Sequence, residues 1–318
     1  MAGVKTELDY ECVIVGGGPA GLSAAVYMGR FCRRTLLLDS GTGRWSYGQQ
    51  NENYLGFPRG VSARRLRDLG AAQAARFGVT PTTGRVLGID QLPDAGFQLI
   101  TDSGVVTTST IIWAAGVRDR WPEFKGARKL VGKLMFWCIV CDGWRSQGRR
   151  LLLLGDTEAA AENALQFLTY TDQVTLLTDP DCDVLSAATR ARLQAEGVTL
   201  LHGRVKTVRL NKDDTPGFEC VHLQDGRLLQ PDLIFSLYGS DPNTELLRGL
   251  PITLTEKGVI DVNAKYQTSL PGFYAAGDVT NHHSDQVSAA VHGGAQAAQA
   301  ANYALYPVRQ RLPETVEM

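Results

Sequence analysis

Short apolar runs alternate with stretches of helical periodicity along most of the chain. Each run has the length of a buried strand, and most of them end at Gly or Asp. The runs lie at residues 12–15, 35–38, 110–116, 151–154, 174–177 and 272–278. Helices rich in small residues are expected after the first and fourth runs and from about 286 to 306. Strands that alternate with helices predict parallel sheets and an α/β fold.

The turn after the first strand has the sequence of a dinucleotide-binding site. Residues 16–21 read Gly-Gly-Gly-Pro-Ala-Gly and lie between a strand and a helix, which is the context that this motif requires. Gly16 makes a tight turn, Gly18 lets the backbone approach a pyrophosphate, and Gly21 lets the helix pack on the strand. Asp39 ends the next strand, where an acid accepts a hydrogen bond from a ribose hydroxyl. We call residues 16–21 the first glycine turn.

The same strand, turn, helix and strand recur from residue 151, but the chemistry of the second turn differs. Residues 155–160 read Gly-Asp-Thr-Glu-Ala-Ala, so Thr157 replaces the middle glycine and has an acid on each side. Asp179 and Asp181 stand at the end of the following strand, where an NADP enzyme places arginine for the 2′-phosphate. Repulsion between like charges therefore argues against NADPH. NADH stays open, with Asp179 as a partner for a ribose hydroxyl.

Cys138 and Cys141, spaced as Cys-Ile-Val-Cys and followed by Asp142, form the most reactive motif of the chain. Two intervening residues let both sulfurs meet across one turn, so the pair can cycle between dithiol and disulfide. Asp142 is placed to exchange a proton with a departing thiolate. A zinc site or inert packing would be the alternatives, but zinc would need a second pair of ligands. The remaining cysteines are single: Cys12, Cys32, Cys182 and Cys220.

A third cofactor motif follows the last predicted strand. Asp278 at the end of that strand is suited to hold a ribitol hydroxyl of a flavin. The helix that starts at Gln286 and Val287 can offer backbone N–H groups to the pyrimidine edge of the flavin. Gly277 and Asp278 alone would indicate only a turn. Together with the first glycine turn they indicate FAD.

Length and charge narrow the class of protein. A chain of 318 residues exceeds the usual size of one domain, so two domains are expected. Residues 1–150 carry 20 Lys and Arg against 12 Asp and Glu. This basic half would suit an acidic protein partner; the alternative is that folding mixes both halves over one surface. Basic residues lack the aromatic interleaving of nucleic-acid binding, and no apolar run has membrane-spanning length. With acids at its start instead of an apolar signal peptide, the chain is expected to be cytoplasmic.

The motifs, taken in order, resemble the low-molecular-weight thioredoxin reductases over nearly the full chain. The matching segments are residues 16–21, 53–58, 114–116, 138–143, 242–244, 277–278 and 286–287. The resemblance implies two Rossmann-like, three-layer domains. An FAD-binding domain would comprise residues 1–118 and 249–318, and a smaller dithiol domain, a degenerate pyridine-nucleotide domain, would be inserted at 119–248. It also implies a homodimer.

The resemblance also assigns roles to residues. Cys141 would face the flavin and Cys138 would attack the disulfide of thioredoxin, with Asp142 as proton donor and acceptor. No metal ligands are expected. The predicted cofactor-binding residues are Gly16, Gly18, Pro19, Ala20, Gly21, Asp39, Ser40, Asn53, Ala115, Gly116, Gly277, Asp278, Gln286 and Val287.

The departures from the family pattern concern the electron donor. Loss of the Gly-rich turn at 155–160 and of the paired arginines at 178–181 resembles the ferredoxin-dependent flavin thioredoxin reductases, including the deeply rooted type. A flavin can take up single electrons from ferredoxin, whereas nicotinamide delivers hydride. Three alternatives remain: a flavin dithiol oxidase that uses oxygen, a non-enzymatic flavin redox sensor, and an NADH-linked reductase. The oxidases resemble this chain less, because they tend to carry His where Asp142 stands.

Overall fold

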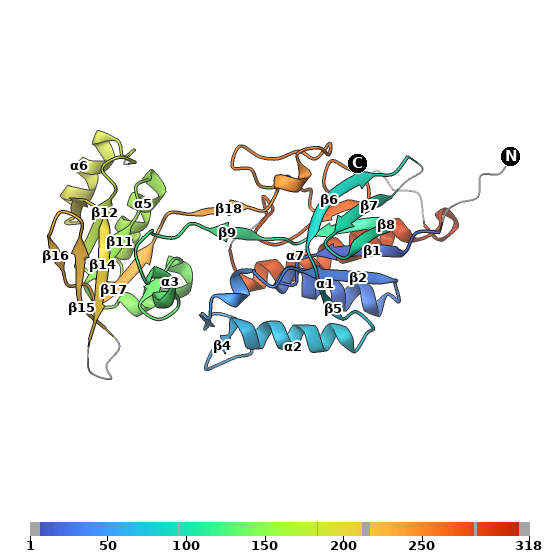
Figure 1. Ribbon diagram of the computed structural model, residues 1–318, viewed down its shortest axis with the longest axis horizontal. Helices are drawn as coiled ribbons and strands as arrows, with labels where there is room; N and C mark the ends of the chain where they lie inside the picture. Colours follow the sequence, from blue (N-terminus) through green and yellow to red (C-terminus); the bar gives the residue numbers. More distant parts are fainter. Residues whose placement is uncertain (1–6, 94–95, 183, 212–216, 283–284, 312–318) are drawn as a thin grey trace, which may run out of the picture. The chain divides into compact units, whose positions relative to one another are not determined.

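The computed structural model describes residues 7–93, 96–182, 184–211, 217–282 and 285–311. Within them the chain divides into two units (Figure 1). The first unit comprises the described parts of 1–46, 62–118 and 241–318, and the second those of 47–61 and 119–240. Each unit has its own hydrophobic core. No helix among the described residues is long and apolar enough to cross a membrane.

The first unit is built on a seven-stranded sheet in its described residues. The order is β5-β2-β1-β8-β7-β6, with β19 also paired to β8. These strands are β1 (Tyr10–Val15), β2 (Thr35–Asp39), β5 (Pro81–Thr83), β6 (Val86–Gln91), β7 (Phe97–Thr101), β8 (Gly104–Trp113) and β19 (Phe273–Ala275). β1, β2, β5, β8 and β19 are parallel, whereas β6 and β7 form an antiparallel extension. The buried ends of β1, β2 and β8 are apolar, at residues 12–15, 37–38 and 111–113, as expected of strands in the interior of a parallel sheet.

Three helices accompany this sheet. They are α1 (Pro19–Arg30), α2 (Ala63–Ala75) and α7 (Val287–Leu305). α1 follows the first strand directly and packs against both α2 and α7 (Figure 1). Small residues on α1 and α7 permit this packing, and Ser23 also donates a hydrogen bond of 2.7 Å to the carbonyl of Val291. The helix predicted at 286–306 and the strands predicted at 12–15, 35–38, 110–116 and 272–278 are present in this unit.

The second unit contains a smaller parallel sheet in the order β10-β17-β11-β12-β13 and a three-stranded antiparallel sheet β14-β15-β16. The strands are β10 (Met135–Phe136), β11 (Leu151–Leu154), β12 (Val174–Thr178), β13 (Thr199–His202), β14 (Val205–Leu210), β15 (Phe218–Leu223), β16 (Leu228–Leu229) and β17 (Leu233–Ser236). The helices are α3 (Ala127–Leu130), α4 (Ile139–Asp142), α5 (Glu158–Phe167) and α6 (Ala187–Ala195). All four leucines of β11 are buried, as expected of a central parallel strand. The predicted α/β class with two Rossmann-like parts is confirmed.

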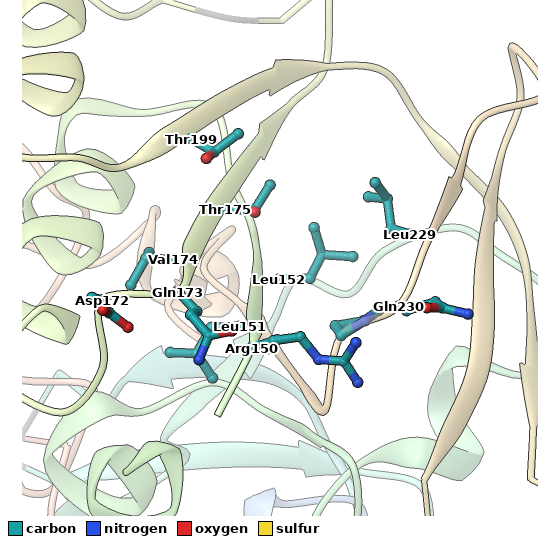
Figure 2. A pocket seen from close by; sticks show the side chains of 11 residues that line it. Arg150, Leu151, Leu152, Asp172, Gln173, Val174, Thr175, Thr199, Leu229 and Gln230 are labelled. Atoms are coloured by element: carbon teal, nitrogen blue, oxygen red, sulfur yellow. The ribbon is translucent and has the colours of Figure 1, made fainter. Parts of the chain in front are cut away.

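A cavity of about 380 Å³ lies at the amino ends of three parallel strands in the second unit (Figure 2). Leu151, Val174 and Thr199, the first residues of β11, β12 and β13, belong to its lining. Ligands of open α/β sheets bind beyond the carboxyl ends of the strands. This cavity therefore lies at the end of the sheet away from the second turn. Arg150 beside it is paired with Asp232 at 2.8 Å.

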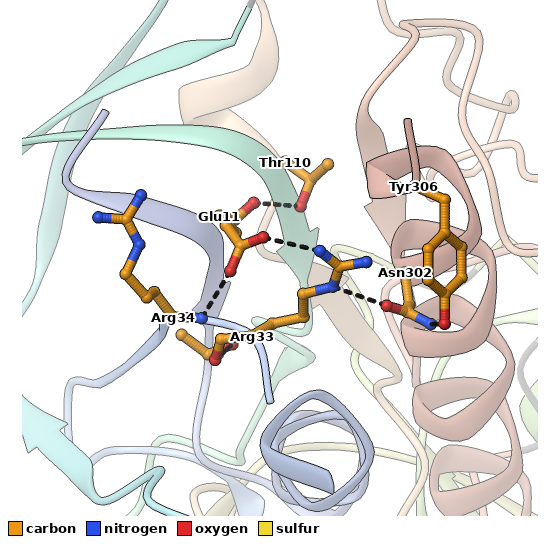
Figure 3. Close-up of polar contacts among 7 residues, drawn as sticks. Glu11, Arg33, Arg34, Thr110, Asn302 and Tyr306 are labelled. Carbon is orange, nitrogen blue, oxygen red and sulfur yellow. Dashed lines mark hydrogen bonds and ion pairs between the residues drawn. The ribbon is translucent and has the colours of Figure 1, made fainter. Parts of the chain in front are cut away.

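A polar network ties the end of α7 to the start of the first unit (Figure 3). Arg33 bonds to Glu11 at 2.8 Å and donates from Nε to Oδ1 of Asn302, also at 2.8 Å. Asn302 donates to the hydroxyl of Tyr306, and the guanidinium of Arg33 lies 5.0 Å from the centre of the Tyr306 ring. Asn302 is only 5% exposed. The network therefore fastens segments far apart in the sequence into one unit.

The segment 47–61 belongs to the second unit rather than to the first. The Tyr47 ring contacts those of Trp121 and Trp137, with centroids 5.4 and 5.8 Å apart. Glu52 pairs with Arg145 at 3.0 Å. The domain bounds expected from the family resemblance stay a prediction, and these contacts are the physical reason that the units divide differently.

Candidate active site

Cys138 and Cys141 form a disulfide in the second unit. Their Cα atoms are 5.3 Å apart because Cys138 caps the short helix α4 and Cys141 lies one turn further on. The backbone N–H of Cys141 donates to Sγ of Cys138 at 3.1 Å. Such a donor stabilises negative charge on the sulfur that accepts it. The structure thus brings the two predicted redox cysteines together and favours Cys138 as the thiolate.

Asp142 follows the disulfide at the end of α4 and is 8% exposed. Its backbone N–H donates to the carbonyl of Cys138 at 3.0 Å, which fixes it to the same turn. Burial raises the pKa of Asp142, and a hydrogen bond from Arg145 at 2.8 Å opposes that rise. A carboxyl group with a raised pKa can hold and release a proton closer to neutral pH. Asp142 thus has the surroundings of a proton-transfer group.

The rim of the disulfide is partly open to solvent. Cys138 and Cys141 are half-buried, whereas the neighbouring Val140 and Trp144 are 72% and 49% exposed. Trp137 on the other side packs against Trp121, with ring centroids 5.3 Å apart. Of the two tryptophans that bracket the dithiol, Trp144 is therefore the one that is open to a partner.

The first glycine turn leaves room for a dinucleotide. Gly16 has φ of +112°, and a Cβ there would lie 2.2 Å from the carbonyl oxygen of Ala114. A Cβ on Gly18 would meet nothing within 4 Å, so the start of α1 faces open space. Pro19 and Ala20 form the first turn of α1, whose free N–H groups suit a phosphate. This turn fits the pyrophosphate of FAD.

Asp39 has a partner that the sequence did not reveal. Its side chain accepts from the N–H of Gly41 at 3.1 Å and pairs with Arg67 of α2 at 3.0 Å. Arg67 lies over the ring of Trp45, 4.8 Å from the ring centre. Asp39 is 6% exposed at the end of β2 beside the first glycine turn. Its position is that expected for binding a ribose, and Arg67 holds its carboxylate there.

The remaining predicted flavin contacts lie in different segments. Asp278 pairs with Arg44 at 2.9 Å, and Arg44 also bonds to Asp285 at 2.8 Å. Asn243 donates to the carbonyl of Ala115 at 2.8 Å and thereby fixes the turn after β8. The other predicted contacts of the first unit are Ser40, Gly116 in the turn after β8, Gly277 beside Asp278, and Gln286 and Val287 at the start of α7. Asn53 belongs to the segment 47–61 of the second unit. These assignments stay predictions.

The second turn is occupied by contacts within the protein. Thr157 caps α5 by accepting from the N–H of Ala160, in place of a glycine approach to phosphate. The carboxylate of Glu158 accepts from the N–H of Ser186 at 2.7 Å and from the hydroxyl of Thr189 at 2.5 Å. These hydrogen bonds, that of Thr189 foremost, lower the pKa of Glu158. A negative charge is thus fixed at the turn.

The end of β12 carries an internal ion-pair cluster. Arg204 pairs with Asp179 at 2.6 Å and with Asp181 at 2.6 Å. The hydrogen bond from Arg204 holds the pKa of Asp179 below its usual range. Arg204, a cation that sequence spacing did not link to this place, is therefore used by the protein's own acids. Among the described residues, no group of three or more His, Cys, Asp and Glu side chains is placed for a metal ion.

Comparisons with known proteins agree with this geometry. The family model described as pyridine nucleotide-disulphide oxidoreductase matches residues 10–296. A thioredoxin reductase of Treponema pallidum is 30% identical, with 93% of this chain and 97% of the relative covered. A thioredoxin reductase of Aquifex aeolicus is 28% identical, with 96% of each chain covered. The crystal structure of thioredoxin reductase from Streptococcus pyogenes has a TM-score of 0.85 at 26% identity and covers 93% of this chain and 98% of its own.

Proposed function

The chain belongs to the pyridine nucleotide-disulphide oxidoreductase family, and on that basis we propose that it is a flavoprotein reductase of thioredoxin whose electron donor is not NADPH. The observation that carries the reductase assignment is the half-buried Cys138–Cys141 disulfide with Asp142 fixed to the same turn. The near full-length similarity to thioredoxin reductases supports thioredoxin as the substrate.

FAD is the cofactor, and the residues of the first unit fit it. The first glycine turn would receive the pyrophosphate, and Asp39 and Asp278 would hold hydroxyl groups of the ribose and the ribitol. When bound, FAD supplies a store that accepts electrons singly and passes them on in pairs.

The protein's own residues then perform the thiol exchange. After reduction of the disulfide, the Cys138 thiolate attacks one sulfur of the thioredoxin disulfide, and the other sulfur of thioredoxin leaves as a thiolate. Cys141 then attacks Sγ of Cys138, which re-forms the internal disulfide and releases thioredoxin as a dithiol. Asp142 gives or takes the proton of Cys141 in these steps. Each cycle consumes two electrons and two protons.

The filled second turn supports a donor other than NADPH. The fixed charge of Glu158 would face a pyrophosphate, and Asp179 with Asp181 would face a 2′-phosphate. Arg204, the cation of the ion-pair cluster, is already shared by the two aspartates. Binding NADPH would require breaking these contacts and bringing like charges together.

We propose ferredoxin as the donor, supplying two electrons from two reduced molecules. Charge supports an acidic protein partner. Four exposed cations lie on α3 or within three residues of its ends in the second unit: Lys125, Arg128, Lys129 and Lys133. We call them the basic patch. Arg128 lies over the ring of Trp121, which contacts Trp137 next to Cys138. A patch of one sign steers a partner of opposite charge to the region of the dithiol.

A reconstituted assay tests the proposal. Reduced ferredoxin, the purified holoprotein and oxidised thioredoxin should yield thioredoxin dithiol, and Cys138→Ser should abolish the yield. The matched control is Cys182→Ser, which removes an exposed free thiol outside the dithiol. Production of hydrogen peroxide from a small dithiol, with no turnover of thioredoxin, would instead identify an oxidase and overturn the proposal.

A further inference from the structure

One guanidinium in the second unit bridges two carboxylates beside the disulfide. Nε of Arg145 donates to Oδ1 of Asp142 at 2.8 Å, and Nη2 pairs with Oε2 of Glu52 at 3.0 Å. The two carboxylates come from distant segments, α4 and the segment 47–61. Arg145 therefore connects the turn of the dithiol with a part of the chain that precedes it by many residues.

Packing fixes the guanidinium in this position. Arg145 lies 4.7 Å from the ring centre of Trp144 and 5.4 Å from that of Phe136, so aromatic rings contact it in addition to the two carboxylates. A planar guanidinium suits such stacking and can bind two acids at once, which a lysine ammonium cannot do with the same geometry. The arrangement thus depends on arginine specifically.

The surroundings of Asp142 make it sensitive to this bridge. Asp142 is 8% exposed, and burial raises its pKa. Among the described residues, the charges that act on it come from Arg145, which lowers the pKa, and from Glu52, which raises it. These are the charged groups that face Asp142 from its own turn and from the segment packed against it.

We propose that Arg145 is a positioning residue that fixes the carboxylate of Asp142, the residue that follows the dithiol, and that Glu52 tunes Asp142 by sharing the same guanidinium. The inference rests on the proposed function for the role of Asp142 as proton donor and acceptor. It assigns to Glu52 and the segment 47–61 control over how readily Asp142 keeps its proton. Any movement of that segment would then change the proton exchange at Cys141.

The proposal predicts opposite effects on the proton affinity of Asp142 when Arg145 or Glu52 is removed. Without the guanidinium, the buried carboxylate of Asp142 loses its stabilising charge, so its proton affinity rises. Without the charge of Glu52, Arg145 serves Asp142 alone and a nearby repulsion disappears, so the proton affinity falls. A residue that only supported the fold would not give shifts of opposite sign.

The test is an infrared titration of the protonated carboxyl band of Asp142 in the oxidised, FAD-bound protein. The band is assigned by its loss in Asp142→Asn. Arg145→Gln should raise the proton affinity about tenfold or more, Glu52→Gln should lower it, and Arg145→Lys should restore part of the wild-type value. Glu162→Gln, which neutralises an exposed acid of α5 in the same unit, should leave it unchanged.

The results separate this inference from the proposed function, because the titration needs neither an electron donor nor thioredoxin. Shifts of Arg145→Gln and Glu52→Gln in the same direction, or no shift in either, would overturn the inference while leaving the donor question untouched. If Arg145→Gln does not fold, the downward shift in Glu52→Gln and an upward shift in Arg145→Lys still decide it.

Discussion

The two turns that follow β1 and β11 have the same local architecture but different contents. At the first glycine turn, Gly18 leaves open space in front of α1, and the acid at the end of β2 is held by Arg67. At the second turn, Thr157 caps the helix itself and Glu158 is bonded to the neighbouring helix. The comparison shows that one strand, turn and helix framework can leave the start of its helix open in one unit and bond that start to its own side chains in the other.

The difference has an electrostatic cause that local geometry alone does not show. Backbone N–H groups at a helix start attract any anion, whether a phosphate or a carboxylate of the same chain. In the second unit the carboxylate of Glu158 accepts from the N–H of Ser186, the N-cap of α6, while Asp179 and Asp181 after β12 are paired with Arg204. The first unit has no acid within residues 16–21, so a bound phosphate can take that place.

The largest effect is expected from closing the first glycine turn. Gly16→Ala would place a Cβ 2.2 Å from the carbonyl oxygen of Ala114 at a φ of +112°, which costs strain and shifts the turn. Near-complete loss of bound FAD should follow, measured as flavin absorbance per protein after purification.

The matched control separates close approach from backbone strain. Gly78 has φ of +83° but a Cβ there would meet nothing within 4 Å. Gly78→Ala should lose some stability and keep its FAD. Equal FAD content in Gly16→Ala and wild type would show that the first glycine turn does not hold the cofactor.

The next largest effect, on nucleotide binding, is expected from removing the two acids that follow β12. Asp179→Ala with Asp181→Ala frees Arg204 from both partners, and a charge-assisted contact to a 2′-phosphate is worth about 1.5–3 kcal/mol. Binding of NADPH, measured by calorimetry, should tighten about tenfold or more. NADH lacks that phosphate and should tighten less. An equal gain for both nucleotides would contradict the assignment of this site to a 2′-phosphate.

Charge reversal of the basic patch should have a smaller effect that depends on salt. Lys125→Glu with Lys129→Glu should lower kcat/KM for ferredoxin about tenfold at low ionic strength, and the loss should fade as salt screens the charges. Reversal of Lys206 and Arg209, exposed cations on β14, is the control. If both pairs of charge reversals lower kcat/KM for ferredoxin equally, the effect comes from net charge alone and the basic patch is not a specific contact.

The smallest effect, on the stability of the first unit, is expected from removing Asn302 from the polar network that it forms with Arg33 and Tyr306. Asn302→Ala removes the acceptor of Arg33 Nε and should lower the free energy of unfolding by about 1–3 kcal/mol, seen in denaturant unfolding. Gln299→Ala on the exposed side of α7 removes only a bond to its own helix and should cost less. A larger loss at Gln299 would mean that the network in Figure 3 does not stabilise the unit.

Local patterns predicted the framework, because strand length, glycine turns and helical periodicity are local properties. The runs at 12–15 and 151–154 became central strands, and Cys138 and Cys141 met across one turn as their spacing indicated. The sequence also predicted that the second turn differs from the first, since Thr157 replaces a glycine in the motif itself.

The partners of the charged residues could not be predicted in the same way. Arg67 reaches Asp39 and Arg145 reaches Glu52 from remote segments, and such pairs depend on tertiary packing rather than on sequence spacing. The packing of segment 47–61 with the second unit has the same origin, because it follows from contacts such as that of Tyr47 with Trp137. Periodicity describes which face of an element is buried but not which distant side chain will meet it.

The central claim is that the intact first glycine turn serves a flavin whereas the filled second turn has lost NADPH. Anaerobic reduction of the purified holoprotein, followed by flavin absorbance, tests it most directly. Reduced ferredoxin should bleach the flavin and thioredoxin should restore its colour, while NADPH should leave the absorbance unchanged, and a parallel run with NADH decides between the two nucleotides. Rapid bleaching by NADPH would contradict the account.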